Sequence, residues 1–238
     1  MKALVLALGA GRGAQPWRET IPTPLLPVRG EPLLVHTLRW LKRSGVADIA
    51  VALHQQAEEI REAIGDEVDG TRPIWSREAD PRGTAGAASQ LAPFLDETFL
   101  VVYGNLLLDV DVADLADYHQ ARHALVTLGL VHTDDPASNN MVECDSSGGV
   151  VRFAVKPATW TSAQRTASAG IFIAEPAALD YIPDDRVFDW EDHLLPLLVA
   201  EEQPIYAQLV DGNIVDIGKA SEYERVRATG LESDSTAS

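Results

Sequence analysis

Three glycines follow the first apolar run of the chain, and their spacing is typical of a loop that binds phosphate. Residues 3–8 form the apolar run, and Gly9, Gly11 and Gly13 come directly after it. A glycine-rich turn after a strand directs backbone N–H groups toward an anion. This segment therefore predicts a nucleotide or phosphate site.

The same glycines fit a dinucleotide-binding fingerprint, but the residues that follow argue against it. In that fingerprint Gly9, Gly11 and Ala14 would lie where a strand passes into a helix. Prolines interrupt such a helix, because each removes a backbone donor and fixes φ. They stand at Pro16, Pro22, Pro24 and Pro27. We therefore predict an extended loop over residues 15–28.

The elements that must position this loop alternate between short apolar runs and longer helical stretches. Buried strands are expected at residues 3–8, 49–53, 99–103 and 124–131. Helices are expected at residues 33–44, 57–64, 85–95 and 112–122. This alternation predicts an α/β fold: a doubly wound, mostly parallel, Rossmann-like sheet with helices on both faces.

The pattern changes after residue 135. Strands are expected at residues 140–144, 150–155 and 169–174, the first two flanking a polar, glycine-rich turn, which predicts a small antiparallel lobe. A helix at 190–200, strands at 205–209 and 214–217 and a helix at 221–229 complete the expected elements. We expect one domain over residues 1–229 and a disordered acidic tail at 230–238, because the tail has too little apolar content to pack.

Composition excludes several classes of function. The formal net charge is −17, from 36 acidic and 19 basic residues, which opposes binding to nucleic acid or to an anionic membrane surface. Cys144 is the only cysteine, so neither a disulfide framework nor a cysteine zinc site is expected within one chain. No signal peptide and no apolar run of membrane-spanning length is visible, which predicts a cytoplasmic protein.

The proline-containing loop and later segments resemble the sugar-phosphate nucleotidyltransferases, which make NDP-sugars. The similarity is greatest to the mannose-1-phosphate guanylyltransferase branch and covers nearly the whole chain. The matching segments include PLLPVRGEPLLVH at 24–36, RGTAGAASQLAPFL at 82–95, FLVVYGNLLLDVDVADL at 99–115, GGVVRFAVKP at 148–157, SAGIFI at 168–173, FDWEDHLLPLLVAEEQPIYA at 188–207 and VDIGKASEYERV at 215–226. The resemblance implies a GT-A-type sheet, with a nucleotide-binding part at about residues 1–135 and a sugar-phosphate-binding part at about 136–229.

The family reaction is in-line attack of a sugar 1-phosphate oxygen on the α-phosphorus of an NTP, with release of pyrophosphate. Charge builds up on phosphate oxygens, so Mg²⁺, cations and oriented backbone donors are needed. By resemblance, Lys156 contacts the sugar phosphate, Asp216 holds the metal and Arg12 is a third catalytic candidate. The expected nucleotide-binding residues are Leu8, Gly9, Gly11, Arg12, Gly83, Thr84 and Gly104, and the expected sugar-phosphate-binding residues are Lys156, Ser168 and Gly170.

The sequence departs from the family pattern at the loop and at the metal. Gly13 stands where the family has an arginine that clamps the triphosphate, with Arg12 one residue early, and Thr23 replaces a lysine. Asn105 replaces a metal-binding aspartate, so we expect a weak ligand at this position and weakly held Mg²⁺. Removing one preorganised electrostatic group typically costs about 10²–10³ in rate.

Two further departures fall on sugar contacts. Val155 replaces the glutamate of the E-K-P motif, and Ser168 replaces an asparagine. Asp109 is a candidate to replace the metal-binding carboxylate lost at Asn105. Asp111 is a second candidate, but we expect it to cap the helix at 112–122.

Two hypotheses about function follow. The first is an active nucleotidyltransferase with a remodelled site, whose ligands are a nucleotide and a sugar phosphate. The second is a catalytically silent homologue that binds nucleotide or NDP-sugar and regulates a partner. Both a homo-oligomer and association with an active homologue are compatible with the sequence.

Overall fold

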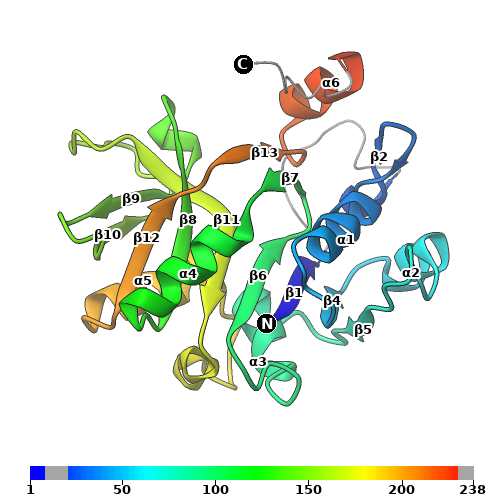
Figure 1. The fold of residues 1–238 in the computed structure, drawn as a ribbon, viewed down its shortest axis with the longest axis horizontal. Helices are drawn as coiled ribbons and strands as arrows, with labels where there is room; N and C mark the ends of the chain where they lie inside the picture. The colour runs from blue at the N-terminus through cyan, green and yellow to red at the C-terminus, as the bar shows by residue number, and fades with distance from the viewer. Residues whose placement is uncertain (9–20, 230–238) are drawn as a thin grey trace.

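The computed structural model describes residues 1–8 and 21–229, and one large mixed sheet dominates it (Figure 1). The strand order along the main path is β10-β9-β11-β6-β1-β4-β5, and β8 and β12 extend the sheet from β11. The strands of this sheet are β1 (Lys2–Ala7), β4 (Ile49–Leu53), β5 (Ile74–Arg77), β6 (Phe99–Tyr103), β8 (Val126–His132), β9 (Met141–Cys144), β10 (Val150–Ala154), β11 (Thr166–Ala174) and β12 (Ile205–Leu209).

Both directions of pairing occur in this sheet. β1 pairs in parallel with β4 and β6, β4 with β5, and β8 with β12. β11 runs antiparallel to β6 and β8, and β9 and β10 form an antiparallel hairpin. The predicted mostly parallel sheet with a smaller antiparallel part is confirmed.

Helices cover both faces of the sheet, as predicted. Successive side chains of a strand point to opposite faces. In β1, Ala3 and Val5 face α1 (Leu33–Arg43), α2 (Ala57–Ile64) and α4 (Val112–Arg122), whereas Leu4 and Leu6 face α3 (Gly83–Gln90) and α5 (Leu195–Ala200). Figure 1 shows α1 and α4 on the same side of the sheet.

Two small sheets and one helix lie outside the central sheet. β7 (Leu106–Val110) pairs with β13 (Gly212–Asp216), and β2 (Pro27–Val28) pairs with β3 (Glu31–Pro32), both antiparallel. The α6 helix (Ala220–Thr229) packs on β13 and β2 through Tyr223 and Val226. Short 3-10 helices are Thr23–Leu25, Pro136–Ser138 and Pro176–Tyr181.

The expected helix at 190–200 differs from the structure. Trp190–Leu194 is π-helical, and an α-helix begins only at Leu195. Pro196 has no N–H to donate to the carbonyl four residues earlier, so the regular α-helical ladder cannot continue there. The helix expected at 85–95 also shifts, to Gly83–Gln90, and ends before Pro93.

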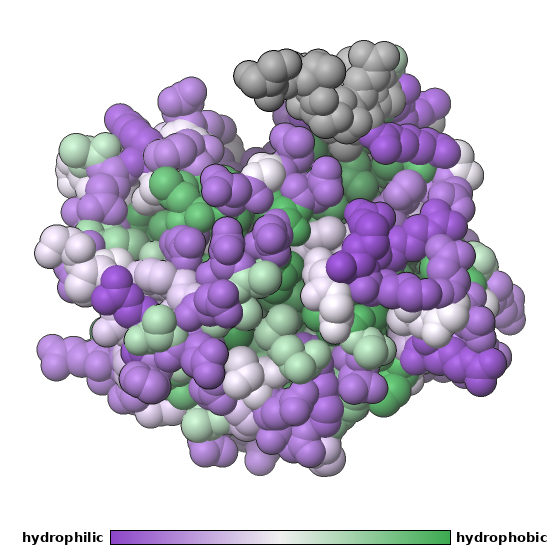
Figure 2. All heavy atoms as spheres, in the orientation of Figure 1, coloured by the Kyte–Doolittle hydropathy of each residue, from purple (hydrophilic) through white to green (hydrophobic). Residues whose placement is uncertain are grey.

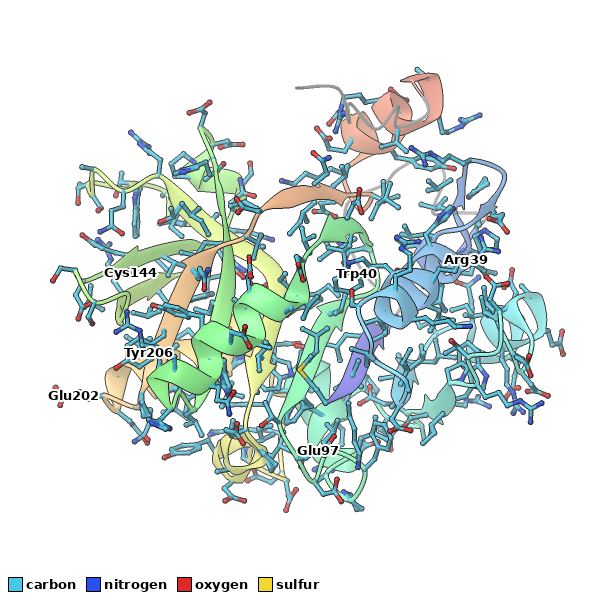
Figure 3. All side chains as sticks on the ribbon, viewed as in Figure 1. Arg39, Trp40, Glu97, Cys144, Glu202 and Tyr206 are labelled. Atoms are coloured by element: carbon cyan, nitrogen blue, oxygen red, sulfur yellow. The ribbon has the colours of Figure 1, made fainter. Side chains whose placement is uncertain are left out.

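The surface agrees with a highly charged chain. Figure 2 shows hydrophilic residues spread over one whole face, with hydrophobic residues between them. Within residues 1–8 and 21–229, no helix is long and apolar enough to span a bilayer. Cys144, at the end of β9, lies far from Arg39 and Trp40 of α1 (Figure 3), and burial raises the pKa of its thiol to about 11.

Candidate functional site

The central sheet has a switch point between β1 and β6. The connection from β1 to β4 runs through α1 on one face, whereas the connection from β5 to β6 runs through α3 on the other. Ligands of open α/β sheets bind at the carboxyl ends of the strands at such a point. Leu8 follows β1 and Gly104 follows β6 at this edge, and the Gly104 N–H donates to the Leu6 carbonyl at 2.9 Å.

Three of the expected nucleotide-binding residues, Gly9, Gly11 and Arg12, lie outside the described residues. The other expected contacts with the nucleotide are Gly83 and Thr84, at the start of α3. The Thr84 N–H and hydroxyl both donate to Asp189 Oδ1, at 2.8 and 3.0 Å, and the Trp190 N–H donates to Thr84 Oγ1 at 2.9 Å. These bonds fix the start of α3 against the π-helical turn.

Gly83 is required by close packing. Its φ is +82°, and a Cβ at this position would lie 2.5 Å from the Phe188 carbonyl oxygen. Gly45 also has a positive φ, +76°, but a Cβ there would meet nothing within 4 Å. The two glycines therefore share the conformational constraint and differ in the contact.

We expect Gly83→Ala to destabilise the fold more than Gly45→Ala. Both variants place a side chain at positive φ, at a cost of about 1–2 kcal/mol. Gly83→Ala adds overpacking against Phe188, which costs a further ~1–3 kcal/mol. Urea unfolding measures both, and an equal loss of unfolding free energy in the two variants would contradict the contact.

Tyr103 connects this turn to the sugar-phosphate side of the site. Burial raises the pKa of Tyr103 well above its usual value, and a hydrogen bond with Thr84 acts against that rise. A Cβ on Gly170 would lie 2.9 Å from Leu106 Cδ1 and 3.2 Å from Tyr103 Cδ2. Gly170 therefore brings β11 against the chain segment that carries Gly104.

A polar cluster lies on the β11 side of the site. Burial raises the pKa of Glu191, while hydrogen bonds from Ser168 and Asn140 and the charge of Lys156 lower it. Ser168 N–H donates to the Asn140 carbonyl at 2.8 Å. The expected sugar-phosphate residues Lys156, Ser168 and Gly170 are thus on neighbouring elements. Hydroxyl, amide, carboxyl and ammonium groups together suit a polyhydroxylated ligand with a phosphate.

Lys156 has an uncommon backbone conformation. It comes two residues after β10 and has φ +38°. Residues other than glycine rarely adopt a positive φ. Such strain persists only where the surrounding structure imposes it, and it concentrates at functional sites. Val155, at the position of the family's glutamate, is 40% exposed and adds no charge beside Lys156.

The structure brings Asn105 and Asp216 together, as the resemblance implies. Asn105 Nδ2 donates to Asp216 Oδ1 at 2.5 Å, and the Gly218 N–H donates to the same oxygen at 2.9 Å. The Ile217 N–H donates to the Asn105 carbonyl at 2.9 Å. A Cβ on Gly218 would lie 2.7 Å from Asp216 Oδ1 and 3.0 Å from Asn105 Nδ2, so a side chain here would displace this pair.

This pair fits only part of a metal site. The amide nitrogen of Asn105 faces Asp216, so the two side chains do not present two oxygens to one cation. Among residues 1–8 and 21–229, no group of three or more acidic, histidine or cysteine side chains could hold a metal. Mg²⁺ is commonly held by one or two carboxylates plus substrate phosphates. Asp216 fits that arrangement with phosphate oxygens as the other ligands.

The other predicted carboxylates lie elsewhere. Asp109 pairs with Asn213 in the β7–β13 ladder and is exposed, whereas Asp216 pairs with Leu106 three positions away. The structure therefore does not bring Asp109 to Asp216. Asp111 accepts a hydrogen bond from the Ala113 N–H at 2.8 Å, which confirms the predicted helix cap.

Thr23 stands where the family has a lysine, in the second half of the loop predicted over residues 15–28. It is 4% exposed and begins the 3-10 helix Thr23–Leu25, so the segment predicted as wholly extended contains a turn. The short, neutral side chain of Thr23 supplies no positive charge to the site.

A buried carboxyl group, Glu78, was missed in the sequence. It directly follows β5 and is 2% exposed, and no side chain in the described part of the chain hydrogen-bonds its carboxylate oxygens. Burial raises its pKa. The charge of His54, a hydrogen bond from the Arg82 backbone N–H and the charge of Arg82 lower it, and the charge of Asp189 raises it. Asp189 bonds Thr84, so Glu78 lies close to the expected nucleotide-binding turn.

Glu78 could be singled out from the sequence only if the strand before it were recognised, and β5 has no buried apolar run that would reveal it. A charged residue directly after a strand is a candidate ligand contact when the strand belongs to a parallel sheet. No local pattern marks Asn140, Asp189 or Glu191, because each acquires its role from contacts with distant segments.

Comparison with known proteins places the chain in a family. The nucleotidyl transferase family matches residues 2–233. A UTP–glucose-1-phosphate uridylyltransferase of Synechocystis sp. is 32% identical over 94% of this chain and 61% of its own length. A probable mannose-1-phosphate guanylyltransferase of Arabidopsis thaliana is 28% identical over 94% of this chain and 63% of its own. The chain thus spans about three fifths of the length of these relatives.

Solved structures show the same fold. A Bacillus anthracis protein assigned as a glucose-1-phosphate thymidylyltransferase superposes with a TM-score of 0.85 at 18% identity, covering 100% of this chain and 98% of that one. HddC from Yersinia pseudotuberculosis, complexed with GMP-PN, gives 0.78 at 21% identity over 94% and 96%. The chain belongs to the nucleotidyl transferase family.

Proposed function

We propose that the protein is a sugar-1-phosphate nucleotidyltransferase, which converts an NTP and a sugar 1-phosphate to an NDP-sugar and pyrophosphate. One observation carries the proposal: three groups lie near the carboxyl ends of β1 and β6. They are the start of α3 with Thr84, the polar cluster of Lys156, Ser168 and Glu191, and Asp216. The relatives are named as enzymes, which favours an active enzyme over a catalytically silent homologue.

The residues divide the work of one displacement. A sugar phosphate oxygen bonds to the α-phosphorus while the bond between that phosphorus and the bridging oxygen to the β-phosphate breaks, and the electron pair leaves with pyrophosphate. Lys156 holds the attacking phosphate and neutralises its charge, and Ser168 and Glu191 orient the sugar. Asp216, together with phosphate oxygens of the substrates, would hold Mg²⁺, which would supply charge neutralisation. A cytoplasmic location and self-association stay predictions.

We further propose that the nucleobase is guanine, because of Glu78. An ionised carboxylate offers two acceptors and no donor. Guanine presents two adjacent donors, N1–H and N2–H, to such a group, whereas uracil presents a single N–H between two carbonyl oxygens. Both oxygens of Glu78 are buried, and no side chain within residues 1–8 and 21–229 hydrogen-bonds them. The Arg82 backbone and the charge of Arg82 compensate the burial only in part, because the pKa of Glu78 stays raised. A pair of donors on the base would compensate the rest.

Glu78→Gln tests this assignment. We expect the ratio of kcat/KM for GTP to that for UTP to fall roughly 10- to 100-fold, because the amide turns one acceptor into a donor. Asp80→Asn, two residues further along and exposed, is the matched control and should leave the ratio unchanged. An unchanged ratio in Glu78→Gln would remove Glu78 from base recognition.

The same variant has a predicted effect on stability. Because the pKa of Glu78 is raised in the folded protein, its charge opposes folding increasingly as pH rises above the ordinary value of 4.5. Glu78→Gln should therefore raise the melting temperature at neutral pH, with the difference shrinking to nothing below pH 4.5. Calorimetric melts across this range measure the difference. A Glu78→Gln variant that is less stable than wild type at pH 7 would contradict a net cost of burying the Glu78 charge.

A further inference from the structure

Resting on the proposed function, we propose that Lys219 is a phosphate-binding cation of the transfer site. With Lys156 it supplies positive charge that the Asn105–Asp216 pair is poorly built to recruit from a divalent cation. The ligand it would take is a pyrophosphate or nucleotide phosphate group. Binding of that group would then persist when divalent cations are removed.

Lys219 belongs to the same turn as Asp216. Its N–H donates to the Asp216 carbonyl at 3.0 Å, one residue after Gly218, whose N–H donates to the Asp216 carboxylate. Its side chain extends to another part of the fold, where Nζ donates to Asn139 Oδ1 at 3.2 Å. The lysine thus links the β13–α6 turn to the segment before β9.

Lys219 reaches the chain segment that also carries the Ser168 cluster. Lys219 bonds Asn139, and the next residue, Asn140, hydrogen-bonds Glu191, whose pKa is lowered by the charge of Lys156. The Asn105–Asp216 pair and the Ser168 cluster meet through the packing of Gly170 on Leu106. An anion bound beside Asp216 would therefore lie near Lys219, whose side chain spans from the Asp216 turn to the segment before β9.

The charges explain why this cation matters. The whole chain carries −17 and contains four lysines, of which two lie at the site. Lys2 pairs with Asp96, whereas the bond of Lys219 is to a neutral amide oxygen. A phosphate oxygen is a stronger partner than an amide oxygen, because both groups then carry charge. Lys219 can therefore exchange its acceptor when an anion arrives.

The position is costly for a purely structural lysine. Lys219 directly precedes α6, and a cation at the positive end of a helix is unfavourable. The amide of Asn139 is held independently, since Nδ2 donates to Thr133 Oγ1 at 3.1 Å and to the Asp135 carbonyl at 2.7 Å. The loop before β9 therefore does not depend on Lys219 for its local order.

Calorimetric titration with inorganic pyrophosphate in excess EDTA tests the proposal. Wild type should bind, Lys219→Gln should bind roughly tenfold more weakly, and Lys219→Arg should stay within a few-fold of wild type. Lys42→Gln is the control for net charge, because Lys42 bonds the Asp69 carbonyl at a distance from the site. Asn139→Ala frees the lysine without removing its charge and should not weaken binding.

Several results would overturn the inference. The first is that wild type does not bind pyrophosphate in EDTA, and the second is that Lys219→Gln binds it with wild-type affinity. The third is that Lys42→Gln or Asn139→Ala loses as much pyrophosphate affinity as Lys219→Gln does. Melting temperatures are measured for every variant. If Lys219→Gln is unstable, Lys219→Arg still tests the proposal, because it keeps the positive charge and should keep the pyrophosphate affinity. Turnover by wild type together with wild-type pyrophosphate affinity in Lys219→Gln would refute only this inference. Absence of turnover would refute the proposed function instead.

Discussion

Replacing Asp216 by asparagine is expected to lower kcat/KM for nucleotidyl transfer by about 10²–10³, the usual cost of removing one preorganised electrostatic group. Asparagine keeps the acceptor that receives the Gly218 and Asn105 hydrogen bonds, so the turn should still form. The negative charge that would hold Mg²⁺ against the phosphates is lost. Pyrophosphate release at saturating and limiting substrate measures the effect.

A neighbouring carboxylate provides the matched control. Asp109 lies in the same two-stranded sheet but is exposed and opposite Asn213. Asp109→Asn should leave kcat/KM within a few-fold of wild type. A large loss in Asp109→Asn, with a small one in Asp216→Asn, would mean that the metal-binding carboxylate is Asp109.

Asn105→Asp is expected to replace the hydrogen bond between residues 105 and 216 by two carboxylates, so that the stability of the fold comes to depend on bound metal. The substitution removes the donor to Asp216 and places two carboxylates side by side, which raises the pKa of one of them. Without metal this should cost about 1–3 kcal/mol of stability. With two carboxylates available, the affinity for Mg²⁺ should rise at least about tenfold.

The signature of this change is thermal. Adding MgCl2 should raise the melting temperature of Asn105→Asp clearly and that of wild type little. At a given concentration, a ligand that binds the folded state more tightly stabilises it more. Asp111→Asn, altered at a helix cap instead, controls for general effects of the ion. Equal melting temperatures of wild type and Asn105→Asp without metal would mean that positions 105 and 216 do not touch.

The layered fold could be predicted because its signals are local. Apolar runs such as 49–53 and 99–103 match β4 and β6, and the helix at 112–122 matches α4 with its Asp111 cap. β5 was missed because Ile74–Arg77 is a short edge strand without a buried apolar run. β7 was missed because only Gly104 and Asn105 separate it from β6, and no further strand was expected between residue 103 and the helix at 112–122.

The site could be predicted only where a motif identifies a residue. The resemblance placed Asn105 beside Asp216, and the structure agrees. It could not indicate that the amide nitrogen faces the carboxylate, because that depends on the turn closed by Gly218. The bond between Asn139 and Lys219 joins residues 80 positions apart, and no local pattern encodes such a contact.

The most direct test of the account is a nucleotidyl transfer assay on the purified chain with Mg²⁺, a panel of sugar 1-phosphates and either GTP or UTP. We predict that pyrophosphate and a nucleoside diphosphate sugar appear in equal amounts, faster with GTP than with UTP, and that Asp216→Asn abolishes most of this turnover. A chain that binds nucleotide by calorimetry, yet releases no pyrophosphate with any NTP across a panel of sugar 1-phosphates, would contradict the account and identify a catalytically silent homologue.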